Sequence, residues 1–186
     1  GIDVQVDEEV SSRAQVLKAI PEPGPAKRVP QRPSASLRQS ALLVNARKEP
    51  SIGQELPLEI ESADEILLLC AFLKWSGVRI VLDALREFCE RGGRLRVITT
   101  TYCGATEPRA LDALVEIGAD VRVSYETQST RLHAKAWLFE RESGLSTAYI
   151  GSSNLSYSAL IDGLEWNVRL AQSETPEMLE RFRAAF

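Results

Sequence analysis

Residues 65–100 read EILLLCAFLKWSGVRIVLDALREFCERGGRLRVITT, and this stretch decides the fold. Residues 66–72 form a continuous apolar run of strand length, which is typical of a strand covered on both faces. Residues 78–91 have apolar side chains at helical spacing and are followed by two glycines, which favour the end of a helix. Because residues 95–100 have the pattern of a second strand, the stretch predicts a β-α-β unit with parallel strands and a right-handed crossover.

The same alternation of strands and helices continues towards the C-terminus. The further strands expected are residues 121–125, 132–139, 147–150 and 166–170. The further helices expected are residues 108–117, a short helix starting near 153 and a last helix starting near 176. A turn signal at Ser143 and Gly144 predicts that the strands on either side form an antiparallel hairpin. The expected fold class is therefore α/β, with a mixed, mostly parallel sheet flanked by helices.

The first 45 residues differ from the rest in composition, because five of the nine prolines lie before residue 40. We expect a short helix near residues 8–20, followed by an extended linker up to residue 45. The compact domain is expected over residues 46–186. The chain starts with Gly1 rather than Met, and the helix expected at its C-terminus has no stop signal. We therefore expect the chain to be a fragment of a larger protein.

The composition is that of one globular domain: 186 residues with a net charge of -4, 44% hydrophobic and 26% charged. The longest apolar run, residues 66–73, is shorter than the ~20 residues that a membrane span needs. Cys70, Cys89 and Cys103 include no C-x-x-C pair, so a zinc site is not expected. We expect a soluble cytoplasmic domain with reduced thiols, no metal and no cofactor. The net charge predicts no strong non-specific attraction to nucleic acid.

The only His of the chain lies in the run Arg131-Leu132-His133-Ala134-Lys135. On a strand, residues two apart face the same side, so an imidazole and an ammonium group are expected together. Such a pair suits a phosphate. The ammonium group binds non-bridging oxygens, and the imidazole, whose ordinary pKa is about 6.5, can attack or transfer a proton near neutral pH. The alternative is that this His is a hydrogen-bonded core residue on a buried strand.

A second polar run, Gly151-Ser152-Ser153-Asn154, stands where the second strand of the expected hairpin ends. Gly allows a close backbone approach, Ser and Asn supply hydrogen-bond donors, and the amides at the start of a helix favour an anion. Antiparallel pairing is expected to return this run to the start of the preceding strand, beside the His-x-Lys pair. Ser152 and Asn154 alone would also serve as ordinary helix caps.

Together these residues resemble the H-x-K-x4-D-x6-G-S-x-N signature of the phospholipase D superfamily, whose members cleave phosphodiester bonds through a phosphohistidine. Glu140 stands at the position of the signature Asp, and ten residues rather than six separate it from Gly151. By the same resemblance, Glu165 matches a family acid that binds an active-site imidazole; an ion pair with Arg169 is the alternative. The resemblance implies a phospholipase D-like α/β/α fold.

A narrower resemblance rests on residues 69–77, 99–106, 131–139 and 163–168. These stretches are similar to the phospholipase D-like nuclease domain that is joined to superfamily II DNA/RNA helicases in bacteria. The resemblance implies that a helicase domain is covalently linked in the full-length protein. The chain itself has no G-x-x-x-x-G-K-[ST] phosphate loop, so ATPase or helicase activity is expected only in the absent part.

The resemblance also implies a mechanism. His133 would attack phosphorus, Lys135, Ser152 and Asn154 would bind the phosphate oxygens, and no metal would be required. Arg131 would help to bind the nucleic acid. This chemistry uses two imidazoles, whereas the chain has one. The resemblance therefore implies a homodimer that shares one active site, or a second motif elsewhere in the full-length protein.

Three functions remain open from the sequence. The first is a metal-independent nuclease that acts on DNA in preference to RNA. The second is a catalytically weak module that binds nucleic-acid phosphates for a helicase, with Glu140 and the longer loop as its signs. The third is a lipid phosphodiesterase, which ranks last because no amphipathic lipid-facing helix or polybasic segment is evident. Trp75 and Tyr102 follow strand ends, where base stacking and packing are equally compatible with an aromatic residue.

Overall fold

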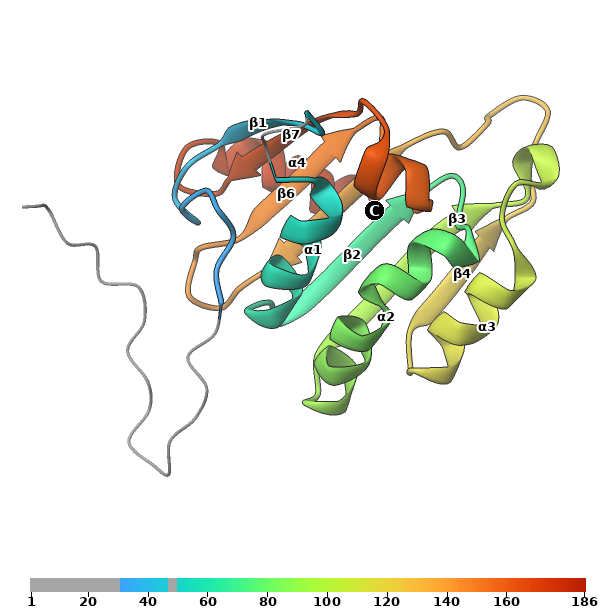
Figure 1. Ribbon diagram of the computed structural model, residues 1–186, viewed down its shortest axis with the longest axis horizontal. Helices are drawn as coiled ribbons and strands as arrows, with labels where there is room; N and C mark the ends of the chain where they lie inside the picture. Colours follow the sequence, from blue (N-terminus) through green and yellow to red (C-terminus); the bar gives the residue numbers. More distant parts are fainter. Residues whose placement is uncertain (1–30, 47–49) are drawn as a thin grey trace, which may run out of the picture. The chain divides into compact units, whose positions relative to one another are not determined.

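The computed structural model describes residues 31–46 and 50–186, which form a mixed sheet with helices on both faces (Figure 1). The strands are β1 (Ala41–Val44), β2 (Glu65–Cys70), β3 (Arg94–Thr100), β4 (Asp120–Ser124), β5 (Lys135–Glu140), β6 (Thr147–Gly151) and β7 (Trp166–Ala171). The helices are α1 (Ile52–Glu61), α2 (Trp75–Glu90), α3 (Pro108–Glu116) and α4 (Pro176–Ala185), with the short turns η1 (Tyr102–Gly104) and η2 (Ser158–Asp162). Neighbouring strands follow the order β1-β7-β6-β5-β2-β3-β4.

The sheet has a parallel part and an antiparallel part. β2, β3 and β4 are joined by helical crossovers and run parallel. β5, β6 and β7 pair antiparallel in succession, and the pairs β1–β7 and β2–β5 are antiparallel as well. The expected α/β class, with a mixed sheet flanked by helices, is confirmed. The expectation of a mostly parallel sheet is wrong, because antiparallel pairs outnumber parallel pairs among the described strands.

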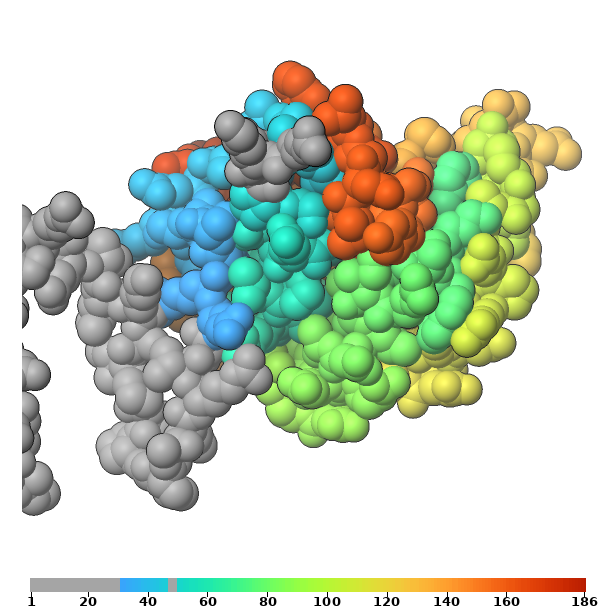
Figure 2. All heavy atoms as spheres, viewed as in Figure 1, coloured from blue at the N-terminus to red at the C-terminus, as the bar shows by residue number. Residues whose placement is uncertain are grey.

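Helices on the two faces of the sheet cover two hydrophobic clusters. α1, α2 and α3 lie on one face and α4 on the other (Figure 1). The larger cluster includes Leu56, Val81 and Phe88 from the helices, while the smaller one places Leu179 of α4 against Leu138 of β5. Figure 2 shows the orange segment with η2 packed against α1 and α2. None of the described helices combines the length and the apolar character that crossing a membrane requires.

The structure adds two elements that the sequence patterns do not predict. β1 lies before residue 46, where the compact domain is expected to begin, and pairs with β7 at the edge of the sheet. α1 contains Gly53 and Pro57, which disguise its helical pattern. It is fixed at its start by a capping box between Ser51 and Gln54. The short helix expected near residues 8–20, and most of the expected linker, lie outside the described residues.

The region of the expected hairpin differs from the prediction at two places. β5 and β6 do form an antiparallel pair, and their turn contains Gly144 at a φ of 73°. β5 begins at Lys135, three residues later than expected. The helix expected near residue 153 begins only at Ser158. The reason is that the chain stays extended through Leu155, which forms a β-bridge with Leu73 after the end of β2.

A buried ion cluster joins α1 to the sheet. The Glu59 carboxylate accepts hydrogen bonds from Arg141 at 2.5 Å and from Arg169 at 2.7 Å. It also accepts from the hydroxyl groups of Thr147 at 2.8 Å and Tyr149 at 3.0 Å. Burial opposes ionisation of Glu59, but the two guanidinium groups outweigh this effect and hold the pKa of the carboxyl below its usual value. One charged acid on α1 therefore neutralises two arginines, one directly after β5 and one on β7.

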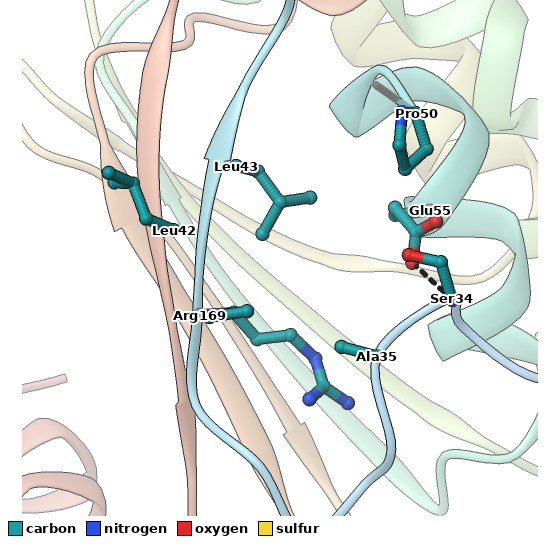
Figure 3. A pocket seen from close by; sticks show the side chains of 8 residues that line it. Ser34, Ala35, Leu42, Leu43, Pro50, Glu55 and Arg169 are labelled. Atoms are coloured by element: carbon teal, nitrogen blue, oxygen red, sulfur yellow. Dashed lines mark hydrogen bonds between the residues drawn. The ribbon is translucent and has the colours of Figure 1, made fainter. Parts of the chain in front are cut away.

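The Arg169 side chain also forms hydrogen bonds with the segment that precedes β1. Figure 3 shows its guanidinium group beside the chain that carries Ser34 and Ala35. Its Nη1 donates to the carbonyl oxygens of Ser36 at 2.8 Å and Gln39 at 2.6 Å. The same guanidinium group thus binds Glu59 and two backbone carbonyls, and it holds the segment before β1 beside β7.

Candidate active site

The candidate site lies at the edge of the sheet where β2, β3 and β4 end. Because β5 runs antiparallel to β2, it begins at this edge, with Lys135 opposite Cys70. β6 ends here at Gly151, one residue beyond the pair formed by Ile150 and Ala136. The start of β5 and the end of β6 therefore meet at one edge, as the hairpin prediction requires.

His133 and Lys135 face the same side, as their spacing predicts. The Lys135 Nζ lies 3.0 Å from His133 Nδ1 and 3.1 Å from Nε2, and it donates to the His133 carbonyl oxygen at 2.8 Å. His133 is exposed, whereas Lys135 is only 8% exposed. The alternative of a buried core His is wrong, because the imidazole is open to a ligand with the ammonium group against it.

The Lys135 ammonium group sits in a partly desolvated position. Burial lowers the Lys135 pKa, although Cys70 and the Glu165 carboxylate act in the opposite direction. The centre of the Phe72 ring lies 5.8 Å from the ammonium nitrogen and 5.6 Å from the centre of the His133 ring. An ammonium group desolvated in this way is attracted to a phosphate oxygen more strongly than a fully hydrated one.

Ser152 and Glu165 form a pair between the end of β6 and the start of β7. The Ser152 hydroxyl donates to the Glu165 carboxylate and accepts from the Trp166 N–H at 3.2 Å. The Ser152 N–H donates to the Trp166 carbonyl oxygen at 3.1 Å. The alternative partner of Glu165, Arg169, binds Glu59 instead. Glu165 thus fixes the orientation of an exposed hydroxyl group at the site.

Gly151 and Ser153 hold the polar run against β7. A Cβ atom at Gly151 would lie 2.3 Å from the Trp166 carbonyl oxygen and 2.4 Å from Asn167 Oδ1, so glycine is required. Ser153 is buried and accepts a hydrogen bond from Asn167 Nδ2 at 2.8 Å. The sequence predicts that this glycine admits a ligand. In the structure the close approach that it allows is to the neighbouring strand.

Asn154 has a buried amide oxygen without a hydrogen-bond partner. The chain then crosses to the end of β2, where the Leu155 N–H donates to the Phe72 carbonyl oxygen at 3.2 Å. This crossing places Asn154 between the end of β6 and the end of β2. The same amide carries an NH2 group, which is the kind of donor that a phosphate oxygen needs.

Gly77, in the first turn of α2, gives the crossing segment room to pass. A Cβ atom here would lie 2.2 Å from the Leu155 carbonyl carbon and 2.3 Å from Ser156 N. We expect Gly77→Ala to lower the free energy of unfolding by about 1–3 kcal/mol, as overpacking does. Urea unfolding followed by circular dichroism measures this loss. Arg79→Ala, at an exposed position of the same helix, is the control; equal stability of the two variants would contradict the packing assigned to Gly77.

Of the other predicted residues, Arg131 and Tyr102 border the site, and Trp75 is the first residue of α2. The Arg131 guanidinium group lies 5.4 Å above the Tyr102 ring, and Tyr102 stacks on Phe72 at 6.4 Å. Trp75 packs against Arg109, whose guanidinium group is 4.0 Å from the centre of its ring. Each ring thus has a guanidinium group over it, an arrangement that is compatible with both base stacking and packing for both aromatic residues.

Glu140 lies at the opposite end of β5, paired with Glu65 of β2. Its carboxylate accepts hydrogen bonds from Arg183 Nη2 of α4 at 2.8 Å and from the Ser146 hydroxyl at 3.0 Å. The whole length of β5 separates Glu140 from Lys135. The replacement of the signature Asp by Glu therefore does not touch the group of side chains around His133.

Cys70 is a neighbour of the site that sequence reasoning assigned only to a reduced core. It is 1% exposed, it lies opposite Lys135, and its Sγ donates to the Phe72 carbonyl oxygen at 3.4 Å. Burial raises the pKa of the thiol to about 11, against the lowering effects of nearby backbone groups and of Lys135. Its position at the end of the first apolar run is the sequence signal that could have placed it here.

We expect Cys70 to resist alkylation in the folded protein, because its thiol is both buried and protonated at about pH 8. Cys103 is exposed and is expected to react first. Iodoacetamide labelling followed by peptide mass spectrometry distinguishes them, with Cys103→Ser as the control that removes the first label. In urea all remaining thiols react. Rapid labelling of Cys70 without urea would show that its placement at the end of β2 is wrong.

Known proteins share this fold. A family model described as the PLD-like domain of cardiolipin synthase matches residues 58–186. The chain belongs to this PLD-like family. The PLD-like domain is similar in structure to NucT from Helicobacter pylori, with 14% identity and a TM-score of 0.55 over 77% of this chain and 92% of that one. A comparison with curated protein sequences finds no match.

Two further solved structures resemble the PLD-like domain. Nuc from Salmonella typhimurium, a phospholipase D family member, has 17% identity and a TM-score of 0.54, with 79% of this chain and 91% of that chain covered. Phosphatidylserine synthase from Haemophilus influenzae has 12% identity and a TM-score of 0.54, with 78% and 38% covered. At these identities the similarity establishes the fold.

The side chains gathered at this edge suit an anionic ligand. An exposed imidazole, a partly desolvated ammonium group, the Ser152 hydroxyl and the Asn154 amide lie around the start of β5. In the part of the chain that the structure describes, no group of three or more His, Cys, Asp or Glu lies together as metal ligands would. The donors present fit the oxygens of a phosphate diester.

Proposed function

We propose that this PLD-like domain is a hydrolase that cleaves phosphodiester bonds of nucleic acid, DNA in preference to RNA, through a covalent bond from phosphorus to His133. The observation that carries the proposal is the contact of Lys135 Nζ with the exposed His133 ring, 3.0 Å from Nδ1, at the edge where Ser152 and Asn154 also lie. The fold shared with NucT and Nuc, most of whose length the chain spans, supports it.

The reaction has two displacement steps. A ring nitrogen of His133 attacks phosphorus, so that a P–N bond forms while the bond to the leaving oxygen breaks. A second imidazole gives its proton to that leaving oxygen. The same imidazole then takes a proton from water, the water oxygen attacks phosphorus, and the P–N bond breaks. The products are an alcohol and a phosphate monoester, and His133 is restored.

The remaining side chains have separate roles in this proposal. Lys135, Ser152 and Asn154 bind the non-bridging oxygens, whose charge grows as the P–N bond forms. The Ser152 hydroxyl has one proton, which turns from Glu165 to the phosphate in this step. Glu165 is a positioning residue, because it acts through the Ser152 hydroxyl that donates to it. Arg131, at the border of the site, binds a neighbouring part of the nucleic acid. No metal or cofactor takes part.

The second imidazole comes from a second copy of the chain in this proposal, since the sequence holds one His. Two apolar side chains beside Glu165 support a contact at this edge, because Leu164 is 79% exposed and Trp166 is 62% exposed. A homodimer with the two edges related by a two-fold axis would place two His133 residues in one shared site.

A mixing experiment tests the shared site. Wild-type chains refolded with an equal amount of His133→Ala chains are expected to lose about half of their activity per wild-type chain, because mixed dimers have one imidazole. Unchanged activity per wild-type chain would show that each chain acts alone. Light scattering of the wild type establishes the oligomeric state. An active monomer would also contradict the shared site.

The partner in the full-length protein is proposed to be a helicase domain, linked to this one in the same chain. The support is the similarity of residues 69–77, 99–106, 131–139 and 163–168 to the nuclease domain that accompanies such helicases. The complete open reading frame is expected to contain a G-x-x-x-x-G-K-[ST] phosphate loop outside the present 186 residues. A complete frame without this motif would remove the helicase from the proposal.

One assay separates the possible functions. Plasmid and oligonucleotide cleavage in EDTA is expected for the wild type. Binding without cleavage would instead indicate a phosphate-binding module, although its proposed sign, Glu140, lies away from His133. A lipid phosphodiesterase is the second candidate, favoured by the family description and by the fold shared with phosphatidylserine synthase. Turnover of phosphatidylcholine or phosphatidylglycerol vesicles without nucleic-acid cleavage would establish it.

A further inference from the structure

An aromatic residue follows each of the three parallel strands at the edge that contains the candidate site. Phe72 follows β2, Tyr102 follows β3 and Tyr125 follows β4. Phe72 and Tyr102 are stacked, with ring centres 6.4 Å apart and planes inclined by 23°. Because Thr100 of β3 pairs with Ser124 of β4, Tyr125 lies level with Thr101, one residue before Tyr102. We call Phe72, Tyr102 and Tyr125 the aromatic row.

The aromatic row starts at the proposed catalytic pair and ends in solvent. Phe72 contacts the His133 ring edge to face, at 5.6 Å between centres. The Arg131 guanidinium group lies over Tyr102 and donates to its hydroxyl at 3.4 Å. Phe72 and Tyr102 are half-buried, and Tyr125 is 78% exposed. Packing in the protein explains the position of the Phe72 ring, but it does not explain why the Tyr125 ring is exposed.

The backbone around Tyr102 is fixed in an uncommon conformation. Cys103, directly after Tyr102, has a φ of 58°, which is in the left-handed region that non-glycine residues rarely adopt. The Tyr102 N–H donates to the Thr100 hydroxyl at 3.1 Å, and the Thr101 N–H donates to the Ser124 carbonyl oxygen at 3.1 Å. Strained backbone of this kind is concentrated at binding and catalytic sites.

We propose that the aromatic row is a stacking surface for the bases of a single nucleic-acid strand on one side of the bond that is cleaved. This inference rests on the proposed function, because it places the scissile phosphate at His133 and Lys135. Bases in a duplex stack on one another and offer no free face, whereas unpaired bases stack on Phe, Tyr or Arg side chains. With neighbouring strands about 4.8 Å apart, the ends of three strands span about 10 Å, which is room for a few unpaired nucleotides.

Stacking also explains how a domain with a net charge of -4 holds nucleic acid. Attraction to phosphates through Lys and Arg clusters falls steeply with salt, and this chain has no polybasic segment. Base stacking needs no charge, so it supplies affinity that survives higher salt. The row therefore favours single-stranded DNA, or the frayed end of a duplex, over an intact double helix.

Equilibrium binding measures this preference apart from cleavage. Fluorescence anisotropy in EDTA, with His133→Ala protein so that no strand is cut, compares a single-stranded oligonucleotide, the same sequence as a duplex and an abasic strand of equal length. The single strand is expected to bind most tightly. The double variant Tyr102→Ala/Tyr125→Ala is expected to weaken its binding at least about tenfold, and to leave the already weak binding of the abasic strand unchanged.

Two variants serve as controls. Tyr102→Phe/Tyr125→Phe keeps both rings and is expected to bind the single strand as the parent does. Val115→Ala removes an exposed apolar side chain from α3, outside the row, and is expected to have no effect. Circular dichroism of all variants shows whether each is folded. A folded Ala double variant is the condition for comparing affinities; if it unfolds, the single variant Tyr125→Ala, at the most exposed position, replaces it.

Several results would overturn the aromatic row. The first is equal binding of the single strand by the Ala and Phe double variants, and the second is an equal loss of affinity for the abasic and the base-containing strand. The third is tighter binding of the duplex than of the single strand. The fourth is a loss of affinity in the Ala variant that is seen only when phosphatidylglycerol vesicles replace the oligonucleotide. Cleavage by wild-type protein is scored separately. Base-dependent binding without any cleavage would support the stacking surface and refute the phosphodiesterase. Cleavage of single strand and duplex at equal rates, with no base-dependent binding, would support the phosphodiesterase and refute the stacking surface.

Discussion

Replacing Glu59 with Gln is expected to lower the free energy of unfolding by roughly 3–5 kcal/mol, the usual loss when one partner of a buried ion pair is removed. Glu59 is fully buried and binds Arg141 at 2.5 Å and Arg169 at 2.7 Å. Gln has almost the same shape, so the change isolates the charge. Two guanidinium groups would remain in the interior without their shared counter-ion, and their desolvation would no longer be offset.

Urea unfolding followed by circular dichroism measures this loss, and Asp83→Asn is the matched control. Asp83 also binds an arginine, at 2.6 Å from Arg86, but its side chain is 89% exposed. Removing a charge from such a surface pair is expected to change stability by less than about 1 kcal/mol. If Glu59→Gln and Asp83→Asn unfold at the same urea concentration, the ion cluster does not stabilise the fold.

The dependence on pH gives a second measure of the same cluster. The pKa of Glu59 is lower in the folded chain than its ordinary value of 4.5, so the unfolded chain binds this proton first. Its contribution is therefore present above pH 4.5 and is lost as the pH falls through the folded-state pKa. The difference in stability between wild type and Glu59→Gln is expected to narrow below pH 4.5. A difference that is constant down to pH 3, about where exposed carboxylates are protonated, would contradict this assignment.

The parallel half of the sheet could be predicted from local patterns. β2, α2, β3, α3 and β4 each have an apolar period of their own, and glycines mark the helix ends. The pairing of His133 with Lys135 could be predicted in the same way, because residues two apart on an extended chain face the same side. The fold class and the first two residues of the candidate site could therefore be predicted from the sequence.

The antiparallel half and the ion cluster depend on contacts that no local pattern contains. Glu59 binds residues 82, 90 and 110 positions further along the chain, namely Arg141, Tyr149 and Arg169. A glutamate in an unrecognised helix gives no sign of such partners. The short edge strand β1 was hidden for a similar reason, since four residues have too little pattern to be distinguished from a linker.

The polar run after β6 has contacts that a sequence motif does not predict. The signature identifies Ser152 and Asn154 but does not say that Ser152 donates to Glu165, or that Ser153 is buried against Asn167. The sequence pattern also predicts a helix start near residue 153, where the chain instead continues to a β-bridge between Leu155 and Leu73. Helix-cap residues have the same side chains as phosphate ligands, and only the path of the chain separates the two roles.

His133→Ala is expected to slow phosphodiester cleavage in EDTA by at least about 10³-fold, because it removes the group that forms the covalent bond. The variant should remain as stable as the wild type, since His133 is exposed and precedes the first residue of β5. Product formation from a labelled oligonucleotide measures the rate. Acid-labile label retained on the protein after a denaturing quench is expected for the wild type only.

Glu140→Asp is the matched control, because it restores the signature residue on the same strand. Glu140 binds Arg183 and Ser146 at the end of β5 that is remote from Lys135. We therefore expect the cleavage rate of Glu140→Asp to stay within about twofold of wild type. A large gain would mean that the far end of β5 limits the chemistry, as the weak-module hypothesis holds. Undiminished cleavage by purified His133→Ala would refute the phosphohistidine, because this chain has no other imidazole to replace it.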